Sequence, residues 1–184
     1  MNKKKQVTHE RLIRLCFAAM FAALICVATR IIQIPGPSSG YMHLGDCFIL
    51  IGSWVLGPVY GFAASAIGSA IADATSPFAV YVPGTILIKG AMAAIAALIM
   101  RAFVNKAPKY RTVGFFVSGI ASEIFMVSGY FLYETVFMQL AIPAALDGVV
   151  RSSIQGAFGL VLGVILIQVI AKTGVLKKLN AYAV

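Results

Sequence analysis

One short polar segment is the clearest candidate for binding chemistry in this chain. Residues 40–46 read GYMHLGD and lie between two long apolar stretches. The imidazole of His43 and the carboxylate of Asp46 can hold a small molecule through hydrogen bonds and charge. A lone histidine can equally cap a loop, and an aspartate can be the N-cap of a following helix. We expect Asp46 to be this N-cap and also to present an oxygen to a binding site.

Further ionisable residues are embedded in apolar sequence, where charges are costly and usually face a cavity or a partner. At about 1.5 Å of rise per residue, most of them fall within about two turns of one side of the predicted helices, and Glu123 lies roughly 16 Å along its helix. On the last helix, Asp147, Arg151 and Gln155 share one face. A conduit for ions would spread charge over the full depth, so this concentration favours a pocket that opens to one side.

Each residue of the expected pocket also has an interpretation that does not involve a ligand. Any one charged residue could pair only to hold helices together, and Tyr130 could belong to an interfacial aromatic belt. The clustering of the whole set favours ligand binding. Tyr41 and His43 would close over the ligand at the entrance to a pocket ringed by Lys89, Glu123 and Arg151. The expected substrate-binding residues are Tyr41, His43, Asp46, Asp73, Lys89, Glu123, Tyr130, Arg151 and Gln155.

The composition is that of a membrane protein. Of 184 residues, 60% are hydrophobic and only 11% are charged, whereas soluble domains are about a quarter charged. We expect one integral-membrane domain over residues 1–184, with residues 1–9 as a basic cytoplasmic tail. The three cysteines are odd in number and lack a CxxC spacing, which argues against a disulfide framework or a zinc site.

Apolar runs and Gly/Pro breaks predict an all-α bundle of six transmembrane helices. The predicted helices cover about residues 10–32, 46–56, 60–75, 84–104, 112–138 and 144–173. The second and third are short for a span that needs about 20 residues, and an alternative joins residues 46–75 into one kinked or re-entrant unit. Twelve of the fifteen Lys and Arg residues flank the spans, at the two ends of the chain and in the loop 101–111. This pattern indicates cytoplasmic termini and not a nucleic-acid partner.

Motifs for catalysis are missing from the sequence. It contains no Walker motif, no HExxH, no GxSxG and no paired acidic motif of lipid-linked phosphotransfer. We therefore expect a protein that is not an enzyme and that has no cofactor and no metal of its own. Two equal inverted halves, which are typical of self-sufficient carriers, are also not evident.

The first predicted helix carries two overlapping Ala-xxx-Ala pairs. They consist of Ala18, Ala19, Ala22 and Ala23. Small residues at this spacing let helices approach closely in lipid. The pairs could pack inside the bundle or dock a separate membrane subunit, and the spacing is compatible with both.

Three segments together resemble the substrate-binding S components of energy-coupling factor (ECF) vitamin transporters. They are GYMHLGD at 40–46, LGPVYGFAASAIGSAIAD at 56–73 and PGTILIKGAMAAIAALI at 83–99. The resemblance implies a multi-pass protein of a prokaryotic plasma membrane that binds a vitamin near the outer face, under the loop between the first two helices. It also implies association with a transmembrane coupling subunit and two cytosolic ATPases, with Ala18, Ala19, Ala22 and Ala23 as the docking face.

We therefore expect a high-affinity vitamin-binding subunit of an ATP-driven importer. A pocket with both signs of charge suits a small heteroaromatic such as pyridoxine or hydroxymethylpyrimidine, with riboflavin or pantothenate as alternatives. A self-contained secondary carrier or channel is the alternative of another class, and it would transport without ATPases. A structural scaffold, the third possibility, would bind no ligand.

Overall fold

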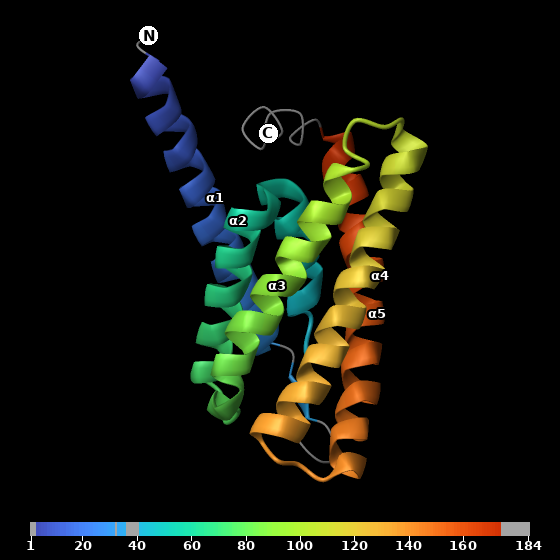
Figure 1. The fold of residues 1–184 in the computed structure, drawn as a ribbon. Helices are drawn as coiled ribbons and strands as arrows, with labels where there is room; N and C mark the ends of the chain where they lie inside the picture. The colour runs from blue at the N-terminus through green and yellow to red at the C-terminus, as the bar shows by residue number, and fades with distance from the viewer. Residues whose placement is uncertain (1–2, 32, 36–40, 174–184) are drawn as a thin grey trace.

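The computed structural model describes residues 3–31, 33–35 and 41–173, and within these ranges the architecture is all-helical (Figure 1). Five long helices are apolar enough to cross a membrane. A short 3-10 helix, a π-helical turn and an antiparallel two-stranded ribbon complete the elements. In chain order these are α1 (Lys3–Ile31), β1 (Ile34–Pro35), β2 (Tyr41–Met42), α2 (Gly45–Ala74), η1 (Ala79–Tyr81), α3 (Val82–Arg101), α4 (Pro108–Leu132), η2 (Tyr133–Phe137) and α5 (Ile142–Lys172).

Helix α2 is one continuous element that turns back on itself at Gly57. This residue is non-helical, with φ +78° and ψ −178°, a conformation that favours glycine. A Cβ on Gly61 would lie 3.1 Å from the Cα of Ser53, although residues eight apart in a straight helix are about 12 Å apart. Figure 1 shows the two arms, residues 45–56 and 58–74, running in opposite directions. The two arms match the predicted helices 46–56 and 60–75, joined here as the kinked unit that was the alternative for residues 46–75.

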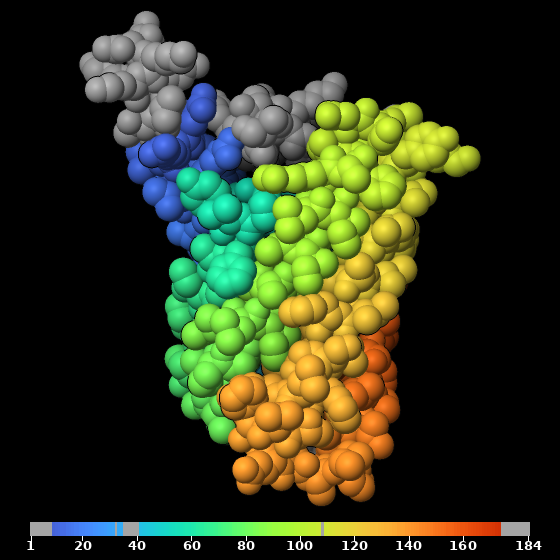
Figure 2. Space-filling view, viewed as in Figure 1, coloured from blue at the N-terminus to red at the C-terminus, as the bar shows by residue number. Residues whose placement is uncertain are grey.

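The five long helices pack into one bundle. Helix α2 packs against α1 and α3, and α5 packs against α2 and α4. Helix α1 begins and α5 ends at the same end of the bundle, whereas the connection between α4 and α5 lies at the opposite, distal end (Figure 1). Along the face seen in Figure 2, the side chains of α3 and α4 form a continuous surface over the interior.

Apolar side chains cover the outside of the bundle as well as its core. Ile25, Leu50 and Met92 are fully buried, while Leu87 and Phe158 are largely exposed on outward faces. A helix that is apolar all round is typical of a membrane span. The chain is therefore a multi-pass membrane protein. Its buried polar residues require a structural or functional explanation.

The first helix begins earlier than expected. Helix α1 starts at Lys3, so residues 3–9 continue the first span as helix, and residues 1–2 lie outside the described chain. Gly40 of the polar segment and the terminal Lys177 and Lys178 also lie outside the described residues.

Candidate functional site

A polar cavity lies at the distal end of the bundle, beneath β2. Its volume is about 40 Å³, which is room for about three water molecules. Six of the nine expected site residues line it, and the remaining lining residues were not expected from the sequence. The lining residues are Tyr41, His43, Asp73, Tyr81, Thr85, Tyr130, Glu134, Arg151, Ser152 and Gln155.

The ribbon of β1 and β2 positions Tyr41 over this cavity. Pro35 pairs with Tyr41 across the ribbon, and the Tyr41 ring lies 4.9 Å from the ring of Phe78. The Tyr41 hydroxyl donates a 2.7 Å hydrogen bond to Oδ1 of Asp73. Burial, together with the neighbouring Asp73 charge, raises the pKa of Tyr41 well above its ordinary value. The hydroxyl therefore remains a hydrogen-bond donor at physiological pH.

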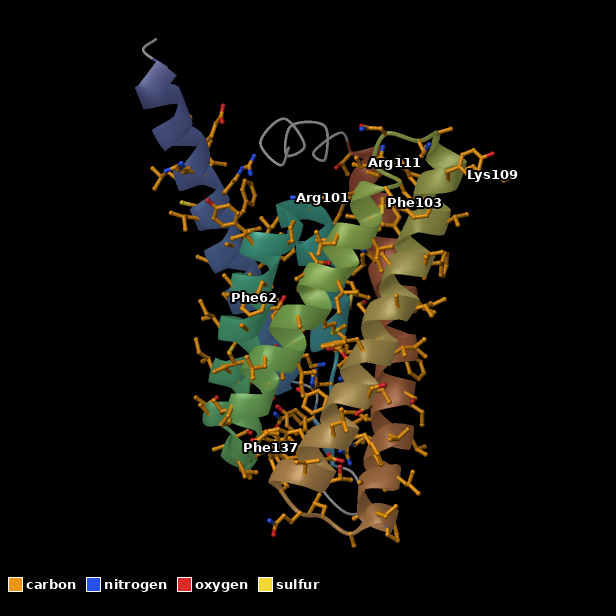
Figure 3. All side chains as sticks on the ribbon, viewed as in Figure 1. Phe62, Arg101, Phe103, Lys109, Arg111 and Phe137 are labelled. Carbon is orange, nitrogen blue, oxygen red and sulfur yellow. The ribbon has the colours of Figure 1, made fainter. Side chains whose placement is uncertain are left out.

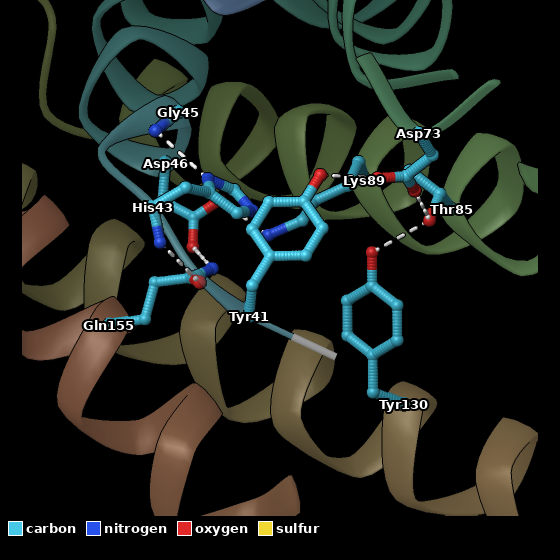
Figure 4. Close-up of polar contacts among 9 residues, drawn as sticks. All are labelled: Tyr41, His43, Gly45, Asp46, Asp73, Thr85, Lys89, Tyr130 and Gln155. Atoms are coloured by element: carbon cyan, nitrogen blue, oxygen red, sulfur yellow. Dashed lines mark hydrogen bonds and ion pairs between the residues drawn. The ribbon is translucent and has the colours of Figure 1, made fainter. Parts of the chain in front are cut away.

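Asp73 also joins the second arm of α2 to α3 and α4 (Figure 4). Its Oδ2 accepts a 2.6 Å hydrogen bond from the hydroxyl of Thr85. The Thr85 hydroxyl in turn lies 3.0 Å from the hydroxyl of Tyr130. Both oxygens of the carboxylate are thus satisfied, and Tyr130 faces the interior instead of an interfacial belt.

Asp46 and Lys89 form an ion pair behind the cavity. The Lys89 ammonium contacts Oδ1 of Asp46, and both side chains are almost fully buried. The Gln155 amide donates a 2.6 Å hydrogen bond to Oδ2 of Asp46. Lys89 also lies 5.5 Å from the centre of the Tyr130 ring. The pair therefore joins the first arm of α2, α3 and α5, and neither charge is free in the cavity.

The expectation that Asp46 caps α2 is wrong. The helix begins at Gly45, so the N-cap position is Leu44, which makes no side-chain cap. Asp46 lies inside the first turn, and its two oxygens contact Lys89 and Gln155. His43 instead receives a 3.0 Å hydrogen bond on Nδ1 from the backbone N–H of Gly45. This is the loop-capping role that the sequence left open for it.

His43 also connects the ribbon to α5. Its backbone N–H donates a 3.1 Å hydrogen bond to Oε1 of Gln155. Burial lowers the pKa of His43 to about 4, and the nearby Lys89 acts in the same direction while Asp46 opposes it. The imidazole is therefore neutral at pH 7, which matches its role as an acceptor.

A second ion-pair network closes the side of the cavity that α5 forms. Nη2 of Arg151 lies 3.2 Å from Oε1 of Glu134, and its Nη1 lies 3.6 Å from Oδ2 of Asp147. The Tyr81 hydroxyl donates a 3.0 Å hydrogen bond to the same Glu134 oxygen. The π-helical turn η2 carries Glu134, and such turns are frequent at functional sites.

Four lining residues were not expected from the sequence. Glu134 could have been identified from the sequence, because it is another acid near the distal end. The orientation of its side chain toward the cavity, however, depends on the π-helical turn. Tyr81 lies in η1, in a segment that was expected to be a loop without a recognisable pattern. Thr85 and Ser152 are hydroxyl residues of the kind that commonly pack between membrane helices.

The structure places Glu123 away from the cavity. Its side chain lies in a groove between α4 and α5, 7% exposed, beside Gly156. Within the described residues neither of its oxygens has a hydrogen-bond partner. Of the three residues expected to ring the pocket, Arg151 lines the cavity, Lys89 is paired behind it and Glu123 lies in the groove between α4 and α5.

The four alanines of α1 divide between two faces. Ala18 is buried, and Ala22 contacts the backbone at Gly68 in the second arm of α2. Ala19 and Ala23 are exposed. All four line an apolar groove of about 570 Å³ between α1 and the second arm of α2. The overlapping pairs thus combine internal packing with an open surface.

The lining of the cavity combines aromatic and polar side chains. Tyr41, Tyr81 and Tyr130 line it, and the network between them contains both donors and acceptors. Across the described part of the chain, His, Cys, Asp and Glu nowhere gather into a group of three that could hold a metal ion.

Comparison with known proteins gives consistent results. The family model for the S component of ECF-type riboflavin transporters matches residues 11–172. A Pyrococcus woesei protein described as "Uncharacterized protein in gap 3'region" is 26% identical over 140 residues, which cover 76% of this chain and 88% of that one. A solved structure titled "Structure and mechanism of the S component of a bacterial ECF transporter" has a TM-score of 0.65 at 17% identity, covering 89% of this chain and 98% of that one. At that identity the structural similarity concerns the fold.

Proposed function

Because the chain belongs to the family of S components of ECF-type riboflavin transporters, we propose that it captures riboflavin at the distal end of its bundle for import. The resemblance seen in the sequence is thereby confirmed at the level of the family. Membership supports a substrate-binding subunit of a vitamin transporter without catalysis of its own. The choice of riboflavin, the site and the partners are our proposal.

The distal cavity is the observation that carries the proposal. It brings three tyrosine rings together with a carboxylate, a guanidinium and an amide. A flavin presents a flat ring for stacking and alternating carbonyl and N–H groups at one edge. Donors and acceptors of the cavity match such an edge, and the aromatic rings match its faces.

Binding requires the site to open. The cavity of about 40 Å³ is far below the roughly 300 Å³ at the lower end of ligand pockets. Tyr41 and His43 are held by one hydrogen bond each to Asp73 and Gln155. We infer that these two residues form the gate, because both bonds are donated by neutral groups of the ribbon segment and lie directly over the cavity.

The charge distribution supports an outward-facing cavity. Figure 3 shows Arg101, Lys109 and Arg111 at the end of the bundle where α1 begins. Basic residues favour the cytoplasmic side. With the two arms of α2 counted as separate crossings, the bundle has six crossings and both ends of the described chain are cytoplasmic. The distal cavity then faces outward across a prokaryotic plasma membrane.

The groove on α1 is the proposed docking surface for the transmembrane coupling subunit. Ala19 and Ala23 are exposed on it, so a partner helix can approach the α1 backbone closely there. Two cytosolic ATPases bound to the coupling subunit would supply the energy for reorientation of the S component and release of the ligand.

A second candidate ligand is a pyridoxine-like or hydroxymethylpyrimidine-like ring. The small cavity volume favours it, because less rearrangement is needed to admit a single ring. Pantothenate is a further alternative, but it has no ring to stack on the tyrosines.

Ligand identity is tested on the purified protein alone. Mass spectrometry identifies any co-purified compound, and titration with riboflavin, monitored by flavin fluorescence, gives the affinity; pyridoxine and pantothenate are titrated by thermal shift. We expect saturable riboflavin binding. Binding of pyridoxine with no riboflavin binding would instead support the second candidate.

A transport assay separates the S component from a self-contained carrier. Proteoliposomes with the purified chain alone should accumulate no riboflavin, whereas addition of the coupling subunit, the ATPases and ATP should start uptake. Uptake by the chain alone would support the carrier.

A further inference from the structure

Glu123 does not line the distal cavity, yet it is buried in the middle of a membrane span. It lies halfway along the span Lys109–Phe137, about 21 Å from either end at the rise of an α-helix. Its side chain is 7% exposed, and within the described residues neither carboxyl oxygen has a hydrogen-bond partner. A charge at this depth is costly unless it has a partner.

The other buried acids of the described chain all have partners. Asp46, Asp73 and Glu134 each accept hydrogen bonds or form an ion pair. Lys89 and Asp46 both act on Glu123 through their charges, but the Lys89 ammonium contacts Asp46. Among the described residues, Glu123 is therefore the buried acid that is left without a counter-ion.

The neighbouring part of α5 gives the Glu123 carboxyl group space but no donor. A Cβ on Gly156 would lie 2.6 Å from Oε2 of Glu123, so the carboxyl group packs where this residue has no side chain. The nearby Ser153 hydroxyl donates its hydrogen bond to the backbone carbonyl of Val149, at 2.7 Å. A carboxyl group in such surroundings takes up a proton and becomes neutral instead of remaining charged.

A groove of about 320 Å³ between α4 and α5 includes Glu123 in its lining. Ile120 and Ile124, which belong to the same groove, are 49% and 62% exposed on the outside of the bundle. In a membrane span such side chains face lipid, so the groove is open to apolar molecules dissolved in the bilayer. Water-soluble ions have no comparable route to this depth.

We propose that Glu123 is a proton-binding site in the membrane interior and that the groove admits apolar electrophiles to it. The matching chemical class is a hydrophobic carbodiimide, which reacts with a protonated carboxyl group in apolar surroundings. The carboxyl proton passes to one carbodiimide nitrogen, and the carboxyl oxygen forms a bond to the central carbon. The acyl group then shifts to the other nitrogen, which gives a stable N-acylurea. No group leaves, and no oxidant or reductant is needed. This site goes beyond the proposed function and does not depend on the identity of the vitamin.

The test treats the full chain in proteoliposomes with dicyclohexylcarbodiimide and locates the adduct by peptide mass spectrometry. We expect Glu123 to gain the mass of one whole reagent molecule and the Glu123→Gln variant to gain none at this position. Asp46 and Glu134 should remain unmodified, because their oxygens are engaged by cations. A cationic, water-soluble carbodiimide should leave Glu123 unmodified, because it does not enter the bilayer.

A second variant tests the groove while the acid stays in place. Ala157 is exposed and lines the groove, so Ala157→Trp should obstruct it and remove most of the labelling of Glu123. Val169→Trp is the matched control, because Val169 is also exposed on α5 but lies about three turns further along the helix. It should be labelled at Glu123 as fast as the unmodified protein.

Three results would overturn the proposal. Absence of an adduct at Glu123 would show that the carboxyl group is charged or closed to the bilayer. Labelling of Asp46 or Glu134 in place of Glu123 would assign the proton to another acid. Undiminished labelling of Ala157→Trp would show that the groove is not the route. Riboflavin takes no part in the reaction, so these outcomes are independent of the tests of the proposed function.

Discussion

Glu134 of η2 and Gly148 of α5 are in close contact across the interface between these two elements. Oε2 of Glu134 lies where a Cβ of residue 148 would stand, so the carboxyl group fits only because residue 148 has no side chain. The same arrangement recurs deeper in the bundle, where a Cβ on Gly156 would lie 2.6 Å from Oε2 of Glu123. The glycines of α5 thus make room for two acids of the preceding segment.

The first prediction concerns this fit. Gly148→Ala should displace Glu134 and with it the contacts to Arg151 and Tyr81, lowering the free energy of unfolding by about 1–3 kcal/mol and weakening ligand binding. Gly163→Ala is the control, because its Cβ would meet only ordinary contacts at 3.5 Å or more and alanine favours helix by about 1 kcal/mol. Thermal unfolding in detergent compares the two. Equal effects of both substitutions would show that the fit to Glu134 does not matter.

The second prediction concerns the buried ion pair. Lys89→Met leaves the Asp46 charge buried without its partner and should cost about 3–5 kcal/mol of unfolding free energy. Asp46→Asn likewise leaves the Lys89 charge buried without its partner. The double variant should cost clearly less than the two single losses combined, since it removes both charges. A double-mutant cycle by thermal unfolding measures this coupling, and strictly additive losses would contradict the pairing.

The third prediction concerns pH. The pKa of His43 is lowered to about 4 in the folded protein, against about 6.5 when unfolded. Between these values the unfolded state binds more protons, so the His43 contribution to stability is complete above pH 6.5 and is lost as the pH falls toward 4, by up to about 1.4 kcal/mol per pH unit. Unfolding free energies from pH 4 to pH 8 measure the slope.

His43→Asn is the matched control for this slope. Its amide oxygen can still accept the Gly45 N–H, but the side chain does not titrate. The difference between the two proteins should therefore vary with pH only below 6.5. Asp46 and Lys89 lie near residue 43 in both proteins, so the comparison isolates the change at that residue. Parallel curves over the whole range would rule out His43 as the source.

The fourth prediction concerns the gate. Tyr41→Phe removes the hydrogen bond to Asp73 and keeps the ring packing on Phe78, so the closed state loses about 1–2 kcal/mol. Ligand dissociation should accelerate about fivefold to thirtyfold with little change in the association rate, as measured by stopped-flow fluorescence. Tyr110→Phe, at an exposed position near the opposite end of the bundle, should change neither rate. A slower association with unchanged dissociation would place Tyr41 outside the gate.

The fifth prediction concerns docking. Ala23→Trp projects a large ring from the exposed face of α1 and should abolish co-purification with the coupling subunit while ligand affinity is unchanged. Leu87→Trp, on a lipid-facing position of α3 that is also exposed, should leave assembly intact. Ala22→Trp differs, because Ala22 contacts Gly68, and it should lower stability itself. Normal assembly of Ala23→Trp would assign the groove to lipid.

Much of the helical architecture was predictable because it depends on local pattern. Apolar runs and Gly/Pro breaks placed the long helices within a few residues, and Gly57 was marked as a break. The two arms of α2 meet at this break, which is a sharp turn, so the structure has the kinked unit that was one of the two expected arrangements. The start of α1 at Lys3 was missed, since polar residues that extend a helix beyond the apolar core carry no hydrophobic signal.

The site was only partly predictable. Charges in apolar surroundings identified Asp73 and Arg151 as interior residues, because burial of an ionisable group in a membrane is costly wherever it occurs. The contacts that these residues make with one another could not be predicted from a pattern in the sequence. Asp46 and Lys89 are 43 residues apart in the chain, and nothing local indicates that Asp46 pairs with Lys89 instead of capping its own helix.

The sequence by itself determined that this protein is a helical membrane protein of the S-component family and that its polar residues gather at one end. Composition, periodicity and motifs are properties of the sequence itself, so they can be determined without a structure. Only the tertiary structure decided that Lys89 is neutralised behind the cavity, that Glu123 faces a separate groove, and that Ala19 and Ala23 form the open side of α1. These outcomes depend on the rotation of each helix about its axis, and that rotation is set by packing between helices distant in sequence.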